Sequence, residues 1–420
     1  MGDNKVSTMN DLGRSTWAEV DLNRLTDNLK EFRGVLPDHV RIMAVIKADG
    51  YGHGAYEVAR AALREGAFML GVASLEEGVE LRRKGISAPV LVLGYTDPGK
   101  SGALIEFDLT PTIFHWETAL AIAEKARSEG KSLPVHVKVD TGMGRIGLRT
   151  PAEVISFLER LSALEGIRIE GLFTHFATAD EPEDEPENEN ENKDSFMQEQ
   201  LRKFTEICRE AENKGMHIPL KHAANSAAAI AYPQSHLDMV RIGIGMYGYY
   251  PSREIRLFPS KNLSQRISPD DNQPSEGLSG EKVKLTPVLS LKTKIIFLKK
   301  IAPGTPVSYG RTFTAQKETL VATVPLGYGD GYSRQFSNNG VMLVRGREAP
   351  VVGRVCMDMT MLDVGGIPGV SEGDEVVVYG KQHDREITVE QAAHRLGTIS
   401  YELLCNISSR IPRVYVKLRT

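Results

Sequence analysis

Short apolar runs alternate with amphipathic runs of helical period through the first 250 residues of the chain. A short apolar run without polar alternation is typical of a strand that is buried on both faces of a parallel sheet. Such runs predict eight strands, at residues 42–46, 69–73, 90–93, 109–113, 135–139, 169–174, 219–223 and 238–242. Alternating strands and helices favour a parallel sheet with right-handed crossovers, and eight strands close a (β/α)8 barrel. A doubly wound open sheet is the alternative, because the runs at 109–113 and 238–242 are weak strand patterns.

Two of the predicted helices carry signals at their ends. Thr150 stands before Pro151 and the amphipathic run AEVISFLERL, which is the pattern of an N-cap followed by proline at the first helical position. Ser74 stands before Leu-Glu-Glu, and basic residues followed by Gly85 end that segment. Each of these helices lies between two predicted strands, as an α/β fold requires.

The pattern changes after residue 250. Residues 251–283 are polar, contain four prolines and have no sustained period, so they predict a linker or insertion. We therefore expect a barrel over residues 15–250, a linker over 251–283 and a β-rich C-terminal domain over 284–420. In the C-terminal domain, strands are predicted at residues 285–298, 319–324, 341–345, 349–355, 375–379 and 413–418, with one helix at about 388–396.

Composition excludes several classes of protein. Lys and Arg total 51 against 55 Asp and Glu, a net charge of −4, whereas nucleic-acid binding needs clustered positive charge. Apolar runs fall short of the 18 residues that a membrane helix needs, and residues 1–14 lack the apolar core of a secretory signal. The three cysteines and the histidines have no disulfide or metal-ligand spacing. We therefore expect a cytoplasmic protein with no metal, nucleic-acid or membrane partner.

The acidity of the chain is local. Residues 180–191 carry eight acidic residues and no basic residue, and without them the net charge would be +4. Such a segment cannot bury a core, so it predicts a solvated insertion. We expect two polar insertions in all, at residues 180–194 and at about 256–282.

Polar side chains follow five of the predicted barrel strands. Catalytic groups of (β/α)8 barrels lie at the C-terminal ends of the strands. The residues in these positions are Lys47 after the first strand, Asp140 and Arg145 after the fifth, His175 after the sixth, Asn225 and Ser226 after the seventh, and Arg241, Gly243 and Gly245 at or after the eighth. We therefore expect the active site at this end of the barrel.

Two of these positions indicate a cofactor. Lys47 ends an apolar strand; such a lysine is most often a strand-end side chain with its amine in water, but a partly desolvated amine is suited to form a Schiff base. Gly243 and Gly245 let the backbone approach a phosphate where barrels commonly bind one, and Ser226 adds a hydroxyl donor. A lysine for an imine together with a phosphate site predicts pyridoxal phosphate.

Nine sequence motifs extend this picture over nearly the whole chain. Residues 44–54 read AVIKADGYGHG, and the others are KVDTGMGRIG (138–147), FTHFA (173–177), HAANSA (222–227), VRIGIGMYG (240–248), VSYGRTF (307–313), PLGYGDGYSR (325–334), GRVCMDM (353–359) and ISYE (399–402). In their order and spacing they resemble the alanine racemases, and only the two polar insertions depart from the pattern.

The resemblance implies a fold, a cofactor and a role for each matching residue. It implies a (β/α)8 barrel, a β-rich C-terminal domain, and a head-to-tail homodimer with active sites shared between chains. Lys47 would hold pyridoxal phosphate and act as base on the D face, and Tyr309 of the other subunit would act on the L face. Arg241 would contact the pyridine nitrogen, and His175 would lie between Arg241 and Tyr309. The remaining matches are Tyr51, Ser226, Gly243, Ile244 and Tyr401 for the phosphate, Arg145 and the Met357 amide for the substrate carboxylate, and Lys138 as the lysine that is often carbamylated.

This set of residues suits racemisation. A proton removed from one face of the α-carbon must be replaced on the other face, which needs two bases. A protonated pyridine nitrogen needs a partner that accepts its proton, and an arginine cannot accept it. With Arg241 at this position the pyridine nitrogen would stay unprotonated, which would limit leakage into transamination. We therefore predict an alanine racemase that supplies D-alanine for peptidoglycan.

Three alternatives are open at this stage. A serine or broad-spectrum racemase of the same family would share these motifs. A barrel-type decarboxylase would place a carboxylate where Arg241 stands. A pyridoxal phosphate carrier would consist of the barrel alone, without a β-rich domain.

Overall fold

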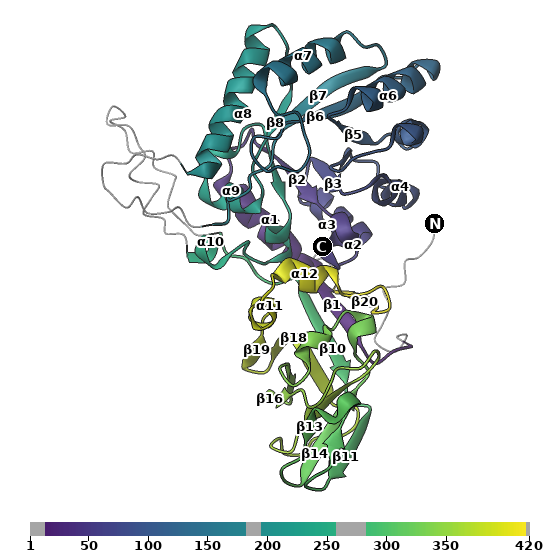
Figure 1. Cartoon of the computed structure of the whole chain (residues 1–420), viewed down its shortest axis with the longest axis vertical. Helices are drawn as coiled ribbons and strands as arrows, with labels where there is room; N and C mark the ends of the chain where they lie inside the picture. Colours follow the sequence, from purple (N-terminus) through teal and green to yellow (C-terminus); the bar gives the residue numbers. More distant parts are fainter. Residues whose placement is uncertain (1–12, 182–194, 258–282, 417–420) are drawn as a thin grey trace, which may run out of the picture. The chain divides into compact units, whose positions relative to one another are not determined.

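The computed structural model describes residues 13–181, 195–257 and 283–416 (Figure 1). The chain forms two compact units. The barrel unit consists of Thr26–Lys47 and Ala59–Thr286, and the β unit consists of the described residues up to Leu25, Ala48–Val58 and the described residues from Pro287 onward. The predicted insertions at 180–194 and 256–282 lie outside the described residues, apart from the first two residues of each.

The barrel unit is built on eight parallel strands, and this confirms the predicted (β/α)8 fold. They are β2 (Arg41–Val45), β3 (Met69–Val72), β4 (Val90–Val92), β5 (Thr110–Ile113), β6 (Leu133–Lys138), β7 (Ile167–Phe173), β8 (Leu220–His222) and β9 (Met239–Ile242). Their order is β8-β7-β6-β5-β4-β3-β2-β9. Backbone hydrogen bonds from Asp238 N to Lys221 O and from Arg241 N to Ala224 O, each 3.0 Å, bring β9 against β8. The sheet is therefore a nearly closed barrel, and the open-sheet alternative is wrong.

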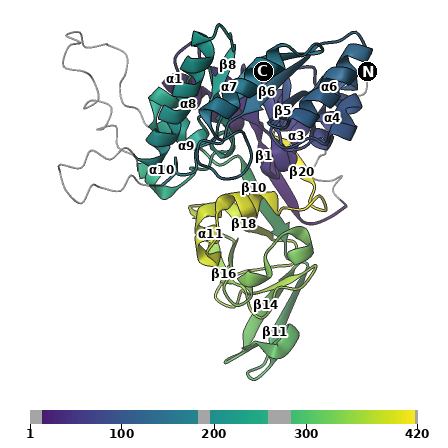
Figure 2. The ribbon, with the colours of Figure 1, turned by 45° about the horizontal axis from the view of Figure 1, so that its top comes forward.

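Helices lie outside the strands of this unit (Figure 2). They are α1 (Leu22–Val35), α3 (Ala55–Arg64), α4 (Leu75–Arg83), α5 (Ser101–Glu106), α6 (Trp116–Ser128), α7 (Pro151–Ser162), α8 (Phe196–Asn213), α9 (Ser226–Ala231) and α10 (Arg253–Leu257). The first four residues of α1 and of α3 belong to the β unit. The predicted caps are present: Ser74 Oγ accepts from Glu77 N, and Thr150 and Glu153 form a reciprocal capping box. Because the helices cover the barrel, strand residues such as Val90, Leu91 and Val92 are fully buried, which explains the unbroken apolar runs.

The β unit contains a seven-stranded sheet, and one of its inner strands comes from the N-terminal region of the chain. Its order is β16 (Arg347–Pro350), β15 (Val341–Val344), β18 (Glu375–Gln382), β10 (Leu289–Lys294), β1 (Trp17–Asp21) and β20 (Arg413–Val416), with β19 (Arg385–Ile387) pairing to β18. β1 lies antiparallel to β10 and parallel to β20. Residues 15–25 and 48–58, which the sequence analysis placed in the barrel segment 15–250, thus belong to the β unit.

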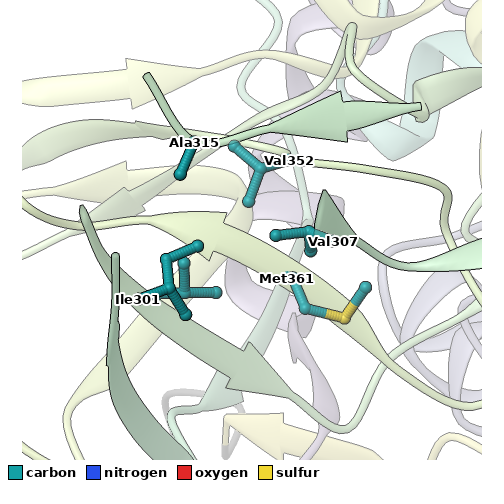
Figure 3. Close-up of a cluster of buried hydrophobic side chains, with 6 residues drawn as sticks. Ile301, Val307, Ala315, Val352 and Met361 are labelled. Carbon is teal, nitrogen blue, oxygen red and sulfur yellow. The ribbon is translucent and has the colours of Figure 1, made fainter. Parts of the chain in front are cut away.

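A smaller sheet and a short hairpin complete the β unit. The sheet is β11 (Phe297–Ile301), β14 (Thr319–Val324) and β17 (Thr360–Asp363), and the hairpin is β12 (Pro306–Val307) and β13 (Phe313–Thr314). A hydrophobic cluster joins them (Figure 3), and its buried members are Ile301, Val307, Ala315, Val321, Val352 and Met361. Phe313 and Cys356 pack against this cluster, so both strands of the hairpin are anchored in it.

The sequence predicted the β unit less completely than the barrel. The run at 285–298 was expected as one strand but forms β10 and the start of β11. The helix predicted at 388–396 is α11 (Val389–Leu396), whereas α12 (Ser400–Cys405) and the short strands β12, β13, β17 and β19 were not predicted. Across the described ranges, no helix is both long enough and apolar enough to cross a lipid bilayer.

Candidate active site

Lys47 follows the first barrel strand and precedes a left-handed turn. Its side chain is half-buried, and Ala48, Asp49, Gly50 and Tyr51 have φ values of +52°, +52°, +62° and +52°. The left-handed conformation costs a non-glycine residue about 1–2 kcal/mol. Neighbouring groups must therefore hold this turn in place.

His53 and Asp49 supply much of that support. Asp49 Oδ1 accepts from Ala55 N at 2.8 Å, and His53 Nδ1 lies 2.8 Å from Tyr51 O and 3.1 Å from Gly50 O. His53 is fully buried, and burial lowers the pKa of its imidazole to about 4, so at neutral pH it is uncharged with a proton on Nδ1. The turn explains the spacing of the KADGYGHG motif: the glycines and the histidine fix the backbone after Lys47.

Arg241 is a buried cation in the barrel unit. One guanidinium nitrogen lies 2.8 Å from Thr174 O, 2.7 Å from Ala223 O and 3.0 Å from His175 Nδ1. The other donates to His222 Nδ1 at 2.9 Å. Burial, with a further contribution from Arg145, lowers the pKa of Arg241 to about 9, so the group remains charged at neutral pH. Within the described ranges no carboxylate forms an ion pair with it.

The hydrogen-bond network continues from Arg241 into the barrel. His222 Nε2 lies 2.8 Å from His136 Nδ1, and His136 Nε2 lies 3.5 Å from the Glu170 carboxylate. Burial lowers the pKa of both histidines, so both are neutral at pH 7. Because arginine only donates, His222 carries its proton on Nε2, and His136 then carries its own on Nε2, facing Glu170. The sequence analysis missed His136, His222 and Glu170, which lie within strands.

Four basic side chains act electrostatically on His175. Burial lowers the pKa of His175 well below its ordinary value, and Arg241, Lys138, Arg145 and Lys47 lower it further in that order. His175 is therefore neutral, and its Nδ1 accepts from Arg241. Because arginine keeps its proton, Arg241 and Arg145 favour an anionic ligand.

Lys138 and Arg145 come from the motif at 138–147. Lys138 is buried with its Nζ 4.5 Å from the centre of the Phe173 ring, and burial together with Arg241 and Arg145 lowers its pKa well below the ordinary value. No hydrogen bond or ion pair links Lys138 Nζ to another described residue. Arg145 is exposed, on a loop that the Asp140 carboxylate organises by accepting from the backbone N–H groups of Gly142, Gly144 and Arg145, each at 3.0 Å.

Ser226, Gly243 and Ile244 meet at the ends of β8 and β9. Ser226 Oγ accepts from Gly243 N at 3.0 Å and from Gly245 N at 3.3 Å, and no described acceptor takes its own hydroxyl proton. A Cβ on Gly245 would lie 2.5 Å from the Phe32 ring, so only glycine fits there. The arrangement leaves a hydroxyl donor for a ligand.

Four of the predicted site residues belong to the β unit. Tyr51 and Tyr401 lie with ring centres 6.1 Å apart. Tyr309 is 70% exposed and Met357 is 53% exposed. The barrel unit thus contains Lys47, Lys138, Arg145, His175, Ser226, Arg241, Gly243 and Ile244, and the β unit contains Tyr51, Tyr309, Met357 and Tyr401.

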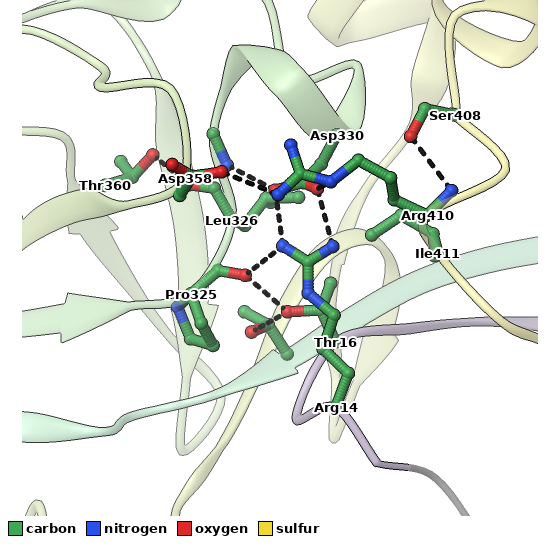
Figure 4. Close-up of polar contacts among 12 residues, drawn as sticks. Arg14, Thr16, Pro325, Leu326, Asp330, Asp358, Thr360, Ser408, Arg410 and Ile411 are labelled. Atoms are coloured by element: carbon green, nitrogen blue, oxygen red, sulfur yellow. Dashed lines mark hydrogen bonds and ion pairs between the residues drawn. The ribbon is translucent and has the colours of Figure 1, made fainter.

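An ion-pair network fixes the backbone beside Met357 (Figure 4). The buried Asp330 carboxylate pairs with Arg14 at 2.7 Å and with Arg410 at 3.5 Å, and Arg410 also reaches Asp358 at 2.6 Å. Asp330 Oδ2 accepts a hydrogen bond from Gly327 N. In the same turn, Gly329 N donates a hydrogen bond to Met357 O at 2.9 Å. Met357 is therefore held by a preformed loop.

Comparison with models of protein families assigns the chain to a family. Residues 20–251 match the model described as "Alanine racemase, N-terminal domain", and residues 288–415 match "Alanine racemase, C-terminal domain". The chain belongs to the alanine racemase family. It is therefore a racemase, an isomerase rather than a decarboxylase or a cofactor carrier. Within the described part of the chain, no group of three or more His, Cys, Asp or Glu residues is arranged to hold a metal ion.

Individual relatives agree with this assignment to the alanine racemase family. "Alanine racemase 2" of Caldanaerobacter subterraneus subsp. tengcongensis is 42% identical over 96% of this chain and 95% of its own length. The solved structure of an alanine racemase from Clostridium difficile 630 has a TM-score of 0.83 and 38% identity, covering 96% of each chain. The structure of alanine racemase from Bacillus anthracis with bound L-Ala-P has a TM-score of 0.84 and 36% identity, covering 97% of this chain and 96% of that one.

Proposed function

We propose that this chain interconverts L- and D-alanine with pyridoxal phosphate as cofactor, using Lys47 and Tyr309 as bases on opposite faces of the substrate. The observation that carries the proposal is Arg241: a buried guanidinium with imidazole and carbonyl partners and no described carboxylate, within a barrel of the alanine racemase family. A serine or broader racemase is not favoured, because the relatives compared above are all named for alanine.

The residues present fit pyridoxal phosphate. Arg241 and Arg145, which act electrostatically on His175, favour a ligand that carries negative charge, and the Ser226 hydroxyl has a proton to donate. We assign Lys47 to the covalent attachment of the cofactor and Tyr51, Ser226, Gly243, Ile244 and Tyr401 to its phosphate. When bound, the cofactor supplies delocalisation of negative charge from the α-carbon.

The chain's own residues then move the α-proton. Lys47 Nζ takes or returns the proton on the D face, and Tyr309 Oη does so on the L face. Arg145 and the Met357 backbone N–H bind the substrate carboxylate, since arginine matches a carboxylate in two hydrogen bonds. Arg241 would face the pyridine nitrogen as a hydrogen-bond donor and, as an arginine, would keep its own proton.

Lys138 has a proposed role beside Arg145. Its buried amine has a depressed pKa and no hydrogen bond or ion pair with another described residue, so the uncharged form, which reacts with carbon dioxide, is more abundant than for an exposed lysine. The resulting carbamate would carry a negative charge and orient Arg145. An intact mass of the peptide that contains residue 138, taken without acid treatment, would show the added 44 daltons.

We also propose a homodimer in which each active site takes Lys47 from one chain and Tyr309 from the other. The exposure of Tyr309 and Met357 in the single chain supports this arrangement, because two proposed site residues are available to a partner. The D-alanine produced would supply peptidoglycan synthesis in the cytoplasm. Growth of a D-alanine-requiring bacterium on expression of this chain tests that role.

The central test is Lys47→Ala. The wild-type holoenzyme should racemise L-alanine faster than L-serine, and borohydride should attach the reduced cofactor to the peptide that contains Lys47. The variant should lose racemisation by more than about 10³-fold and lose the adduct, because no amine remains for the imine or the D-face base. Lys30→Ala, at an exposed lysine of the same unit, is the control and should behave as wild type. A fully active Lys47→Ala variant would refute the assignment.

A further inference from the structure

Ser308, the residue before Tyr309, has an unusual backbone conformation. Its φ is +66° and its ψ is −177°, a region that is otherwise occupied almost only by glycine. Gly310 and Arg311 also have positive φ, at +70° and +51°. A non-glycine residue keeps such a conformation only where its surroundings fix it, and these positions concentrate at functional sites.

The surroundings of Ser308 do fix it. Its Oγ donates to Arg354 O at 2.6 Å and lies 3.5 Å from Cys356 Sγ. The backbone of Gly353 packs closely against this turn, since a Cβ on Gly353 would lie 2.7 Å from both Ser308 Cβ and Val307 O. The hydroxyl is therefore the polar anchor of a tightly packed turn.

The other end of the same turn is also anchored. Asn338 Oδ1 accepts from Gly353 N at 2.6 Å, and Asn338 Nδ2 donates to Thr312 Oγ1 at 3.1 Å. Val307, before the turn, is a member of the hydrophobic cluster (Figure 3), and Phe313, after the turn, packs against that cluster. Between these anchors the Tyr309 side chain is 70% exposed, so the scaffold fixes the backbone and presents the phenol outward.

We propose that Ser308 is a positioning residue that aims the Tyr309 phenol at the L face of the substrate. Its hydroxyl, bonded to Arg354 O, holds the chain in the strained conformation on which the direction of Tyr309 depends. Alanine at 308 would keep the steric strain but lose the anchor, and the turn would relax to negative φ. Glycine would remove both the strain and the anchor, leaving the turn mobile. The inference rests on the proposed function, in which Tyr309 is the L-face base.

The test separates the two faces of the substrate. Loss of α-deuterium to solvent is measured for L-[2-²H]alanine and for D-[2-²H]alanine with the holoenzyme and with Ser308→Ala and Ser308→Gly. We expect loss from L-alanine, and racemisation, to fall by about 10- to 100-fold, because small misplacement of a reacting group has effects of that size. Loss from D-alanine, which depends on Lys47, should stay within about twofold of wild type.

Ser162→Ala is the matched control. It deletes the same kind of hydrogen bond, from Ser162 Oγ to Glu159 O at 2.8 Å, at the end of α7. Both exchange rates of this variant should equal those of the wild type. An equal fall for the two substrates in the Ser308 variants, or no fall for either, would overturn the positioning role. A wild-type enzyme that exchanges neither substrate would instead refute the proposed function.

A second measurement needs no cofactor. Amide hydrogen exchange of residues 306–314 in the cofactor-free chain should be faster in Ser308→Gly than in wild type by about tenfold or more, while the thermal midpoint stays nearly unchanged. The control variant should leave exchange in this segment unchanged. Unaltered exchange in the glycine variant would show that the hydroxyl does not hold the turn and would contradict the proposal.

Discussion

The guanidinium of Arg241 starts a line of hydrogen bonds that runs through His222 to His136, and the Glu170 carboxylate lies 3.5 Å from the far nitrogen of His136. Each neutral imidazole in this line has one ring nitrogen that accepts and one that donates, so the direction of every proton is fixed by the arginine. The sequence pointed to Arg241 because it ends a strand. It did not point to His136 or Glu170, because polar side chains within a strand give no sign of which neighbouring strand they meet.

Replacing Arg241 by glutamate tests why an arginine stands there. A carboxylate can share a proton with the pyridine nitrogen, which an arginine cannot do, and a protonated pyridine would hold negative charge more strongly. We expect Arg241→Glu to racemise alanine about 10- to 1,000-fold more slowly and to form more pyruvate for each racemisation event. Arg241→Lys keeps the cation and should keep the wild-type ratio of the two products. An unchanged ratio in the glutamate variant would contradict this reasoning.

At the scale of elements, the left-handed turn after Lys47 depends on a histidine that is buried without charge. The unfolded chain protonates His53 near pH 6.5, whereas burial in the folded chain lowers that pKa to about 4. Between these values the unfolded state binds more protons, so the folded state loses stability as the pH falls below about 6.5. The fully buried His53 should contribute about 2 kcal/mol of destabilisation between pH 7 and pH 5.

Urea unfolding of His53→Asn at the two pH values measures this contribution. Asparagine can replace the Nδ1 donor but does not titrate, so the variant should be less stable at pH 7 and should lose about 2 kcal/mol less than wild type on going to pH 5. His39→Asn, at an exposed histidine, should keep the wild-type difference. If His53→Asn also kept it, the neutral state of His53 would not be the source of the acid sensitivity.

The elements that the sequence predicted well are those whose burial or capping determines the residue types within the element itself. Val90–Val92 is apolar throughout because both of its faces are covered, and Thr150 and Ser74 are caps that act within one turn. The strands β12 and β13 have two residues each, too few for any period. Tyr309, between them, could be recognised only through the motif VSYGRTF, because an exposed tyrosine in a turn has no local signature of function.

At the scale of the whole molecule, the proposed sharing of sites between chains predicts complementation. Lys47→Ala and Tyr309→Ala chains should each be inactive alone. In a mixed dimer one site receives both intact residues and the other receives both substitutions. Random pairing makes half of the dimers mixed, so roughly a quarter of the wild-type activity should return when the two variants are denatured and refolded together. Mixed dimers that are confirmed by mass and remain inactive would place both bases on one chain.

The position of β1 has a consequence for how the protein is made. The ribosome releases Trp17–Asp21 first, but the strands on either side of it, β10 and β20, begin at Leu289 and Arg413. At translation rates of 5–20 residues per second, β1 waits for roughly 15–55 s before its first partner is synthesised. During that interval Trp17, Ala18 and Val20, all buried in the finished sheet, lack the two strands that flank them there. The nascent chain thus carries an apolar strand without its partners until much of its own C-terminal third has been translated.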